Sequence, residues 1–296
     1  MKANRATDVE SPSGCTPAKR LVLALLTALL AISTVALAGC SNPDETNSEQ
    51  TVEPVYVSPY DWESNLSVEG DRYSYSEDGE QKSLLGIDVS DHQNSINWAA
   101  VKADGVEFAI LRIGYRGSTE GDLYEDSSFA DNVLGAQAAD MPIGVYFFSQ
   151  ATTEDEAREE AQFVLDKLSE HGLSPESLAY PVVFDQEPAE GDGRANGLSA
   201  EQYTKNALAF CQAVEEAGYR PMVYGNQTDM AARNIDQLES YPIWYAEYGP
   251  TVPSANFDFT MWQYTNEGTV RGIDVPVDLN IYMVDERKGT YEVPSA

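Results

Sequence analysis

Two acidic residues, Asp185 and Glu187, follow the apolar segment 182–184 and precede Pro188. A short apolar run that ends at proline predicts a buried strand, which places both acids at its end. Side chains at positions i and i+2 of a strand point to the same side, with Cα atoms roughly 6.5–7 Å apart. The spacing therefore predicts two carboxyl groups that face one pocket.

Two further acids lie next to apolar runs: Asp88 follows residues 84–87, and Asp278 lies within residues 275–280. In barrels of parallel strands the reacting residues gather at the C-terminal strand ends, so these acids are candidates to join Asp185 and Glu187. Burial and like-charge repulsion in such a cluster raise the pKa of one member until it holds a proton near neutral pH. A proton donor beside a fixed carboxylate is what the cleavage of a glycosidic bond requires.

Aromatic residues recur near the ends of the predicted strands. Flat apolar rings with hydrogen-bonding rims bind the faces of sugar rings, so these residues are candidate substrate contacts, although core packing explains each of them equally well. Because neighbours in a strand face opposite ways, Trp244 and Tyr245 cannot both point inward. The candidates, with one amide among them, are Tyr146, Tyr224, Trp244, Trp262, Gln263 and Tyr264.

The composition disfavours several other classes of function. The sequence has only two histidines, His92 and His171, and it shows no cluster of metal ligands, no evident Ser/His/Asp set and no phosphate-binding glycine loop. We therefore expect no metal and no cofactor. The net charge of −31 repels nucleic acid and anionic lipid and is typical of a solvated acidic surface.

From residue 84 onward, short apolar runs typical of strands alternate with amphipathic segments typical of helices, which indicates βα units. After the fifth unit, three strand-like runs follow without a long helix between them. This order predicts an α/β fold, a modified TIM-like barrel of five βα units followed by three strands; an open doubly wound sheet is the alternative. The predicted strands are residues 84–89, 108–115, 143–148, 181–185, 221–224, 243–246, 259–264 and 277–282.

Two of the predicted helices have clear ends. Thr153 and Ser199 each precede a Glu or Gln by three residues, which is the spacing of a capping box, and Gly172 and Gly218 follow the last apolar residues. Cys211 lies on the apolar face of the second helix. We therefore expect a buried structural thiol there and not a nucleophile.

The N-terminal region predicts export. Lys19 and Arg20 precede an apolar stretch, residues 21–38, that is long for a signal peptide and short for a membrane span. Residues 37–40, Leu-Ala-Gly-Cys, resemble the bacterial lipobox, in which the cysteine is acylated and becomes the first residue of the mature protein. We therefore expect Cys40 to carry a lipid anchor that holds the protein at the outer face of the cell membrane. A plain transmembrane anchor is the alternative.

These features divide the chain into four regions. We expect a lipoprotein signal peptide at residues 1–39 and an acidic tether at 40–82, with a small hairpin around Asp78 and Gly79. The barrel follows at residues 83–288, and residues 289–296 form a C-terminal tail.

Several sequence blocks resemble, in order, those of glycoside hydrolase family 25, the Chalaropsis-type lysozymes. The resemblance covers roughly residues 84–283, and one departure from it is Gln186, which stands where many members have an apolar residue or tryptophan. The blocks are residues 86–93, 96–98, 144–148, 181–188, 243–246, 261–264 and 277–280.

The resemblance implies a lysozyme that contacts the cell wall and cleaves the β-1,4 bond between N-acetylmuramic acid and N-acetylglucosamine in peptidoglycan. It implies that Glu187 is the acid/base and that Asp185 supports the substrate's own 2-acetamido group as internal nucleophile. Asp88 and Asp278 would complete the ring of carboxyl groups. The sequence leaves open whether the reaction retains or inverts configuration. Two other functions also stay open: a non-catalytic wall-binding lipoprotein, and a hydrolase of another N-acetylated glycan such as chitin.

Overall fold

The computed structural model describes residues 54–293. The expected signal peptide, the lipidation site Cys40 and the expected tether as far as residue 53 lie outside these residues. Within residues 54–293, no helix is both long enough and apolar enough to cross a membrane.

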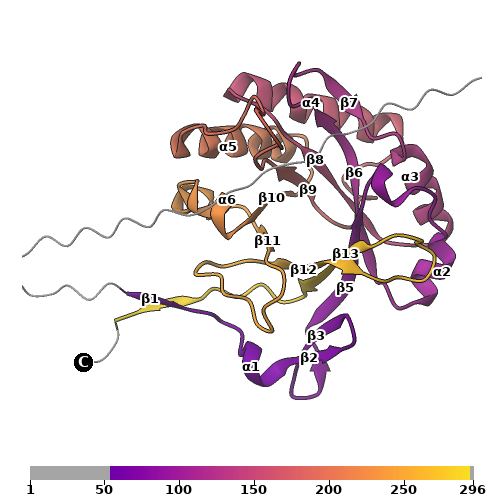
Figure 1. Cartoon of the computed structure of the whole chain (residues 1–296), viewed down its shortest axis with the longest axis vertical. Coiled ribbons are helices and arrows are strands. Elements are labelled where there is room, and N and C mark those ends of the chain that lie inside the picture. Colours follow the sequence, from indigo (N-terminus) through magenta and orange to yellow (C-terminus); the bar gives the residue numbers. More distant parts are fainter. Residues whose placement is uncertain (1–53, 294–296) are drawn as a thin grey trace, which may run out of the picture. The chain divides into compact units, whose positions relative to one another are not determined.

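Eight strands form a closed barrel, as the sequence predicted (Figure 1). Each strand pairs with the next around the ring, and β5 pairs with β6 to close it. Only β13 runs antiparallel to its ring neighbours, β12 and β5. The barrel strands are β5 (Ser83–Val89), β6 (Phe108–Arg116), β8 (Ile143–Phe148), β9 (Val182–Asp185), β10 (Pro221–Asn226), β11 (Ile243–Ala246), β12 (Met261–Gly268) and β13 (Val277–Met283).

Large apolar side chains fill the inside of the barrel. Alternate residues of each strand point inward, which is the two-residue period of a pleated strand. Gly86 leaves room for one of these side chains, because a Cβ atom there would lie 2.1 Å from the ring of Phe108. The inward residues include Phe108, Ile110, Val183, Met222, Trp244 and Met261. The barrel is therefore a packed core that opens only at its ends.

Helices cover the outside of the first five strands and are short or absent after β10 (Figure 1). The side chains of Thr153 and Ser199 accept the backbone N–H of Glu156 and Gln202, so both predicted helix starts are confirmed. Neither helix has the reciprocal bond of a capping box, because the Glu156 carboxylate accepts the backbone N–H of Thr152 and Gln202 Nε2 donates to Asn206 Oδ1. The helices are α2 (Trp98–Ala103), α3 (Phe129–Ala138), α4 (Glu154–Glu170), α5 (Ala200–Glu216) and α6 (Gln227–Ala231), with short 3₁₀ turns at Asp91–Gln93 and Ile235–Leu238.

Parts of the expected tether and tail are structured. Residues 55–57 form β1, which pairs antiparallel with β14 at residues 290–292, so the tail returns to the start of the folded domain. Asp78 and Gly79 turn the chain between β3 and β4. The remaining elements are β1 (Val55–Val57), α1 (Trp62–Asn65), β2 (Leu66–Glu69), β3 (Arg72–Glu77), β4 (Glu80–Gln81), β7 (Leu123–Glu125) and β14 (Thr290–Glu292).

The segment from α1 to β4 packs on the outer surface of β12. The ring of Tyr73 stacks on Tyr264 with centroids 4.2 Å apart, and Trp62 lies 6.0 Å from Trp262 in an edge-to-face arrangement. Tyr75, whose ring lies 5.0 Å from that of Trp62, is fully buried. Aromatic pairs of this kind each add about 1 kcal/mol beyond area burial. This segment is therefore part of the barrel domain.

Candidate active site

The four predicted acids meet in one pocket at the C-terminal end of the barrel. The pocket encloses about 170 Å³ and is narrow and polar. Its lining residues are Asp88, Tyr146, Asp185, Glu187, Tyr224, Trp244, Tyr248, Gln263 and Asp278.

Strand direction explains how the acids converge. Asp185 is the last residue of β9 and Asp88 is near the end of β5. Both therefore lie at the opening of the barrel formed by the C-terminal ends of the parallel strands, here called the mouth. Asp278 lies near the start of its strand, yet β13 is antiparallel and its start is therefore at the same end. The register pairs Asp278 directly with Asp88.

A hydrogen-bond network fixes the carboxyl group of Asp88. Gln263 Nε2 and Asn280 Nδ2 donate to Asp88 Oδ2 over 2.9 and 2.7 Å. Each amide is itself oriented, because Tyr224 donates to Gln263 Oε1 and Trp244 donates to Asn280 Oδ1, both over 2.8 Å. Asp88 is thus held rigidly by two oriented amides.

Burial raises the pKa of every acid in the pocket. The pKa of Glu187 rises to about 7, first through burial and then through the charges of Asp229 and Asp88. That of Asp278 rises to about 8 through burial and the charge of Asp88. Burial also raises the pKa of Asp88 to about 6, against its two amide donors, and raises that of Asp185 well above its ordinary range. Burial and mutual repulsion therefore favour protonated carboxyl groups in this cluster, as an acid beside a carboxylate requires.

Glu187 lies where three hollows meet. Besides the central pocket, it lines a hollow of about 460 Å³ beside Tyr248 and another of about 450 Å³ beside Tyr115. Within the described part of the chain, no side chain forms a hydrogen bond with its carboxyl group. The carboxyl of Glu187 is thus free to meet a ligand that spans both side hollows.

The predicted ligand contacts divide into two groups. Tyr146, Tyr224, Trp244 and Gln263 line the central pocket. Trp262 and Tyr264 do not line it, so the prediction that they contact the substrate is corrected. Their rings pack outside the barrel, against Trp62 and Tyr73 of the segment from α1 to β4. Strand alternation accounts for the split, because Gln263 points inward and its two neighbours must point outward.

Sequence analysis missed four residues near the acids. Asn280 is two positions after Asp278 on one face of β13, so the same two-residue period identifies it. Tyr248 lies in the loop after β11, where no periodic pattern places a side chain. Asp229 and Arg233 belong to a five-residue helix and its end, which is too short to show helical periodicity.

The side chain of Gln186 points away from the pocket. Its Nε2 donates to the carbonyl of Ala151 over 2.6 Å, and Asn206 Nδ2 donates to the same carbonyl. The departure from the family pattern therefore affects packing between β9 and its helices, and it leaves both acids of the pair facing the mouth.

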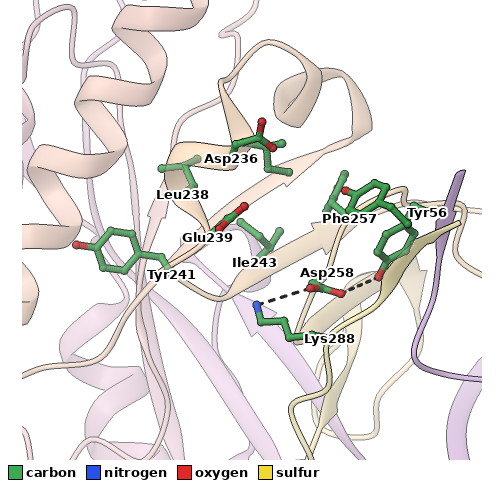
Figure 2. Close-up of a pocket in the computed structure, with 11 residues that line it drawn as sticks. Tyr56, Asp236, Leu238, Glu239, Tyr241, Ile243, Phe257, Asp258 and Lys288 are labelled. Carbon is green, nitrogen blue, oxygen red and sulfur yellow. Dashed lines mark hydrogen bonds and ion pairs between the residues drawn. The ribbon is translucent and has the colours of Figure 1, made fainter. Parts of the chain in front are cut away.

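Another hollow, of about 370 Å³, lies at the other end of the barrel, next to Ile243 at the start of β11 (Figure 2). Asp258 accepts a hydrogen bond from Tyr56 there and lies 3.7 Å from Lys288. None of the four clustered acids lines it. Across residues 54–293, no three His, Cys, Asp or Glu side chains are grouped so as to hold a metal ion.

Comparison with known proteins agrees with this geometry. Residues 87–273 match the sequence model of Glycosyl hydrolases family 25. The chain is 31% identical over 211 residues to Lysozyme M1 of Streptomyces globisporus, covering 67% of each chain. It is 30% identical over 198 residues to the autolytic lysozyme of Clostridium acetobutylicum, covering 67% of this chain and 55% of that one.

A solved structure is also similar. The bacterial lysozyme from Streptomyces coelicolor superposes with a TM-score of 0.55 at 28% identity, over 67% of this chain and 91% of that one. The chain thus spans between about half and two thirds of the two curated relatives and most of this solved structure. The matched region includes Asp88, Asp185 and Glu187. The resemblance found in the sequence is confirmed: the chain is a glycoside hydrolase and belongs to glycosyl hydrolases family 25.

Proposed function

We propose that the chain is an N-acetylmuramidase that hydrolyses the β-1,4 bond between N-acetylmuramic acid and N-acetylglucosamine in peptidoglycan. The position of Glu187 carries this proposal. A glycan that occupies both side hollows passes over the Glu187 carboxyl, whose pKa of about 7 keeps a proton available for the linking oxygen. Glu187 is then the general acid of the cleavage step and the general base for the incoming water.

Asp185 has the properties of a group that positions the substrate's acetamide. It is 5% exposed, and its Oδ1 has no hydrogen-bond partner among the described residues. The carboxyl group lines the central pocket, and its other oxygen, Oδ2, can accept the N–H of a 2-acetamido group. The acetamide oxygen then bonds to the anomeric carbon as the glycosidic bond breaks and the leaving oxygen takes the Glu187 proton. Water, deprotonated by Glu187, subsequently opens the cyclic intermediate.

The other pocket residues have supporting roles in this proposal. Asp88, fixed by Gln263 and Asn280, and the adjacent Asp278 complete the ring of carboxyl groups around the developing positive charge. Tyr146, Tyr224 and Trp244 supply ring edges and hydroxyl groups for contact with the sugar.

The test compares substrates as well as variants. The full chain, a Glu187→Gln variant and a control Glu216→Gln variant on the exposed end of α5 are incubated with purified peptidoglycan and with chitin oligomers. We expect wild type and Glu216→Gln to release soluble fragments from peptidoglycan at similar rates, and Glu187→Gln to release none. Equal turnover of chitin would favour a hydrolase of another N-acetylated glycan. Peptidoglycan binding by wild type without release would favour a wall-binding protein.

We also propose that the protein is exported and anchored by a lipid on Cys40, at the outer face of the membrane and in contact with the wall. The lipobox-like residues 37–40 support this location, and Cys40 lies outside the described residues. A Cys40→Ala variant should leave the membrane fraction. Unchanged fractionation of that variant would contradict the anchor.

A further inference from the structure

A buried arginine lies directly behind the acidic pair. Arg233 follows the C-terminal end of α6 and is 5% exposed. Its guanidinium Nη2 donates to the carbonyl of Gln186, the residue between Asp185 and Glu187, and Nη1 donates to the carbonyl of Asp229 over 2.7 Å. The guanidinium is thus bonded to the short segment that carries both acids.

The surroundings are built to hold this guanidinium in place. It lies over the ring of Tyr203, 5.8 Å from the centroid. Gly225 at the end of β10 leaves the space it occupies, since a Cβ atom there would lie 3.2 Å from Arg233 Nη1 and 2.8 Å from the end of Met230. Burying an arginine costs free energy unless it is paired and hydrogen-bonded, and these contacts offset part of that cost.

The charge of Arg233 acts on the two acids in front of it. The charge of Arg233 lowers the pKa of both Asp185 and Glu187, against the effects of burial and neighbouring acids. Another cation near the mouth, Arg112, is bound to Asp91 and Asp126 over 2.5 and 2.6 Å and so is already neutralised. The titratable and charged groups around the pair are Asp88 of β5, Arg112 of β6, Tyr146 of β8, Tyr224 of β10, Asp229 of α6, Arg233, Tyr248 and Asp278 of β13.

We propose that Arg233 is a positioning residue for catalysis: its bond to the Gln186 carbonyl fixes the direction of Glu187, and its buried charge acts on the carboxyl groups of both Asp185 and Glu187. This role rests on the proposed function, in which Asp185 and Glu187 act as a pair. Arg233 does not line the central pocket or either side hollow, so it acts only through these two acids.

Three variants separate the charge from the hydrogen bond. Arg233→Met removes both, Arg233→Gln keeps an amide donor without charge, and Arg233→Lys keeps charge without the two-armed guanidinium. Without the charge, the ionised forms of both acids lose a favourable neighbour. Both limbs of the pH profile of kcat should therefore move up by about one pH unit in Arg233→Met and Arg233→Gln. In Arg233→Lys both limbs should stay in place, while kcat should fall about tenfold at constant KM because the Glu187 carboxyl group is oriented less precisely.

A direct titration accompanies the rates. The Glu187 carboxyl carbon is followed by ¹³C NMR in labelled full chain, and its signal is assigned by its loss in Glu187→Gln. We expect its midpoint to rise by about one unit in Arg233→Met and Arg233→Gln and to stay near wild type in Arg233→Lys. This readout needs no activity, so a wild type that fails to cleave peptidoglycan would count against the proposed function alone.

Folding of each variant is checked by its thermal transition. If Arg233→Met does not fold, the Gln and Lys variants carry the test. Unchanged profile limbs and an unchanged NMR midpoint in Arg233→Gln would overturn the charge role. A wild-type kcat in Arg233→Lys, whose single ammonium cannot bond both carbonyls as the planar guanidinium does, would overturn the requirement for the two-armed hydrogen bond.

Discussion

Two regions of this molecule bury acids whose pKa lies near 7, and they differ in how those acids are satisfied. Glu160 of α4 is fully buried, and burial raises its pKa to about 7. It accepts hydrogen bonds from Arg116 Nε over 2.7 Å and from Ser149 Oγ over 2.6 Å. Glu187 has a similar pKa but no side-chain partner among the described residues, and it faces three hollows.

The contrast shows that a raised pKa does not identify a catalytic acid by itself. Glu160 is closed in by protein groups that use its hydrogen-bonding capacity, so it stabilises the contact between α4 and β6. Among the described residues, no side chain forms a hydrogen bond with the carboxyl groups of Glu187 and Asp185, and both acids line a pocket that a substrate can enter. Unused hydrogen-bonding capacity beside a cavity is the feature that distinguishes the acids of the central pocket from Glu160.

The largest effect should come from Glu187→Gln. Loss of the proton donor should lower kcat on peptidoglycan by about 10³-fold, roughly 4 kcal/mol in activation free energy, because the amide cannot protonate the leaving oxygen. Steady-state rates and thermal unfolding at one pH are compared with Glu216→Gln. A Glu187→Gln enzyme that keeps more than a tenth of the wild-type rate would show that Glu187 is no more required for catalysis than Glu160 is expected to be.

Glu160→Gln should have the opposite profile. Removing this charge takes from the buried Arg116 its buried counter-ion and leaves it the exposed Glu159, which should cost about 3 kcal/mol of unfolding free energy. The rate per folded molecule should stay within about twofold of wild type. Urea unfolding and active-fraction rates measure the two quantities. A stable but inactive variant would show that Glu160 shares the chemistry.

A pH series sharpens the comparison further. Because the folded pKa of Glu187 is raised to about 7, the native state binds more protons than the unfolded state between about pH 4.5 and 7. Its contribution to stability is therefore present at low pH and is lost as pH rises through 7. Relative to wild type, Glu187→Gln should be more stable at pH 8 than at pH 5 by on the order of 2 kcal/mol. Urea titrations at both pH values decide this, and equal differences would contradict the raised pKa.

The smallest effect concerns a partnered acid near the surface. Arg287 donates to both oxygens of Glu77, over 2.7 and 2.6 Å, and lowers the pKa of that acid to about 2. The pair therefore stabilises the fold at neutral pH and loses this contribution as pH falls through about 2. Arg287→Met should cost about 1 kcal/mol at pH 7, with unchanged kcat, since both side chains are partly exposed. A change in kcat would show that the segment from α1 to β4, which contains Glu77, influences the acids of the central pocket.

Much of the fold and all four acids could be predicted from the sequence. Strand alternation and strand ends identify Asp88, Asp185 and Glu187, because these features depend on local sequence. The same alternation, applied to Gln263, would have placed Trp262 and Tyr264 on the outer surface.

The remaining features depend on contacts between distant residues. Arg233 and Asp229 reach the pair through the five-residue helix α6, which has no periodic pattern. β1 pairs with β14 more than 200 residues away, which neither sequence segment indicates alone. The packing of Tyr73 on Tyr264 likewise joins residues that only the folded barrel brings together.

The most direct test of the central claim is the identity of the newly formed reducing end. Peptidoglycan digested by the full chain is reduced with borohydride and analysed by mass spectrometry, beside the Glu187→Gln variant. Cleavage by the Glu187 and Asp185 pair predicts fragments that end in reduced N-acetylmuramic acid from wild type and none from the variant. Fragments that end in reduced N-acetylglucosamine, or equal release by both proteins, would contradict it.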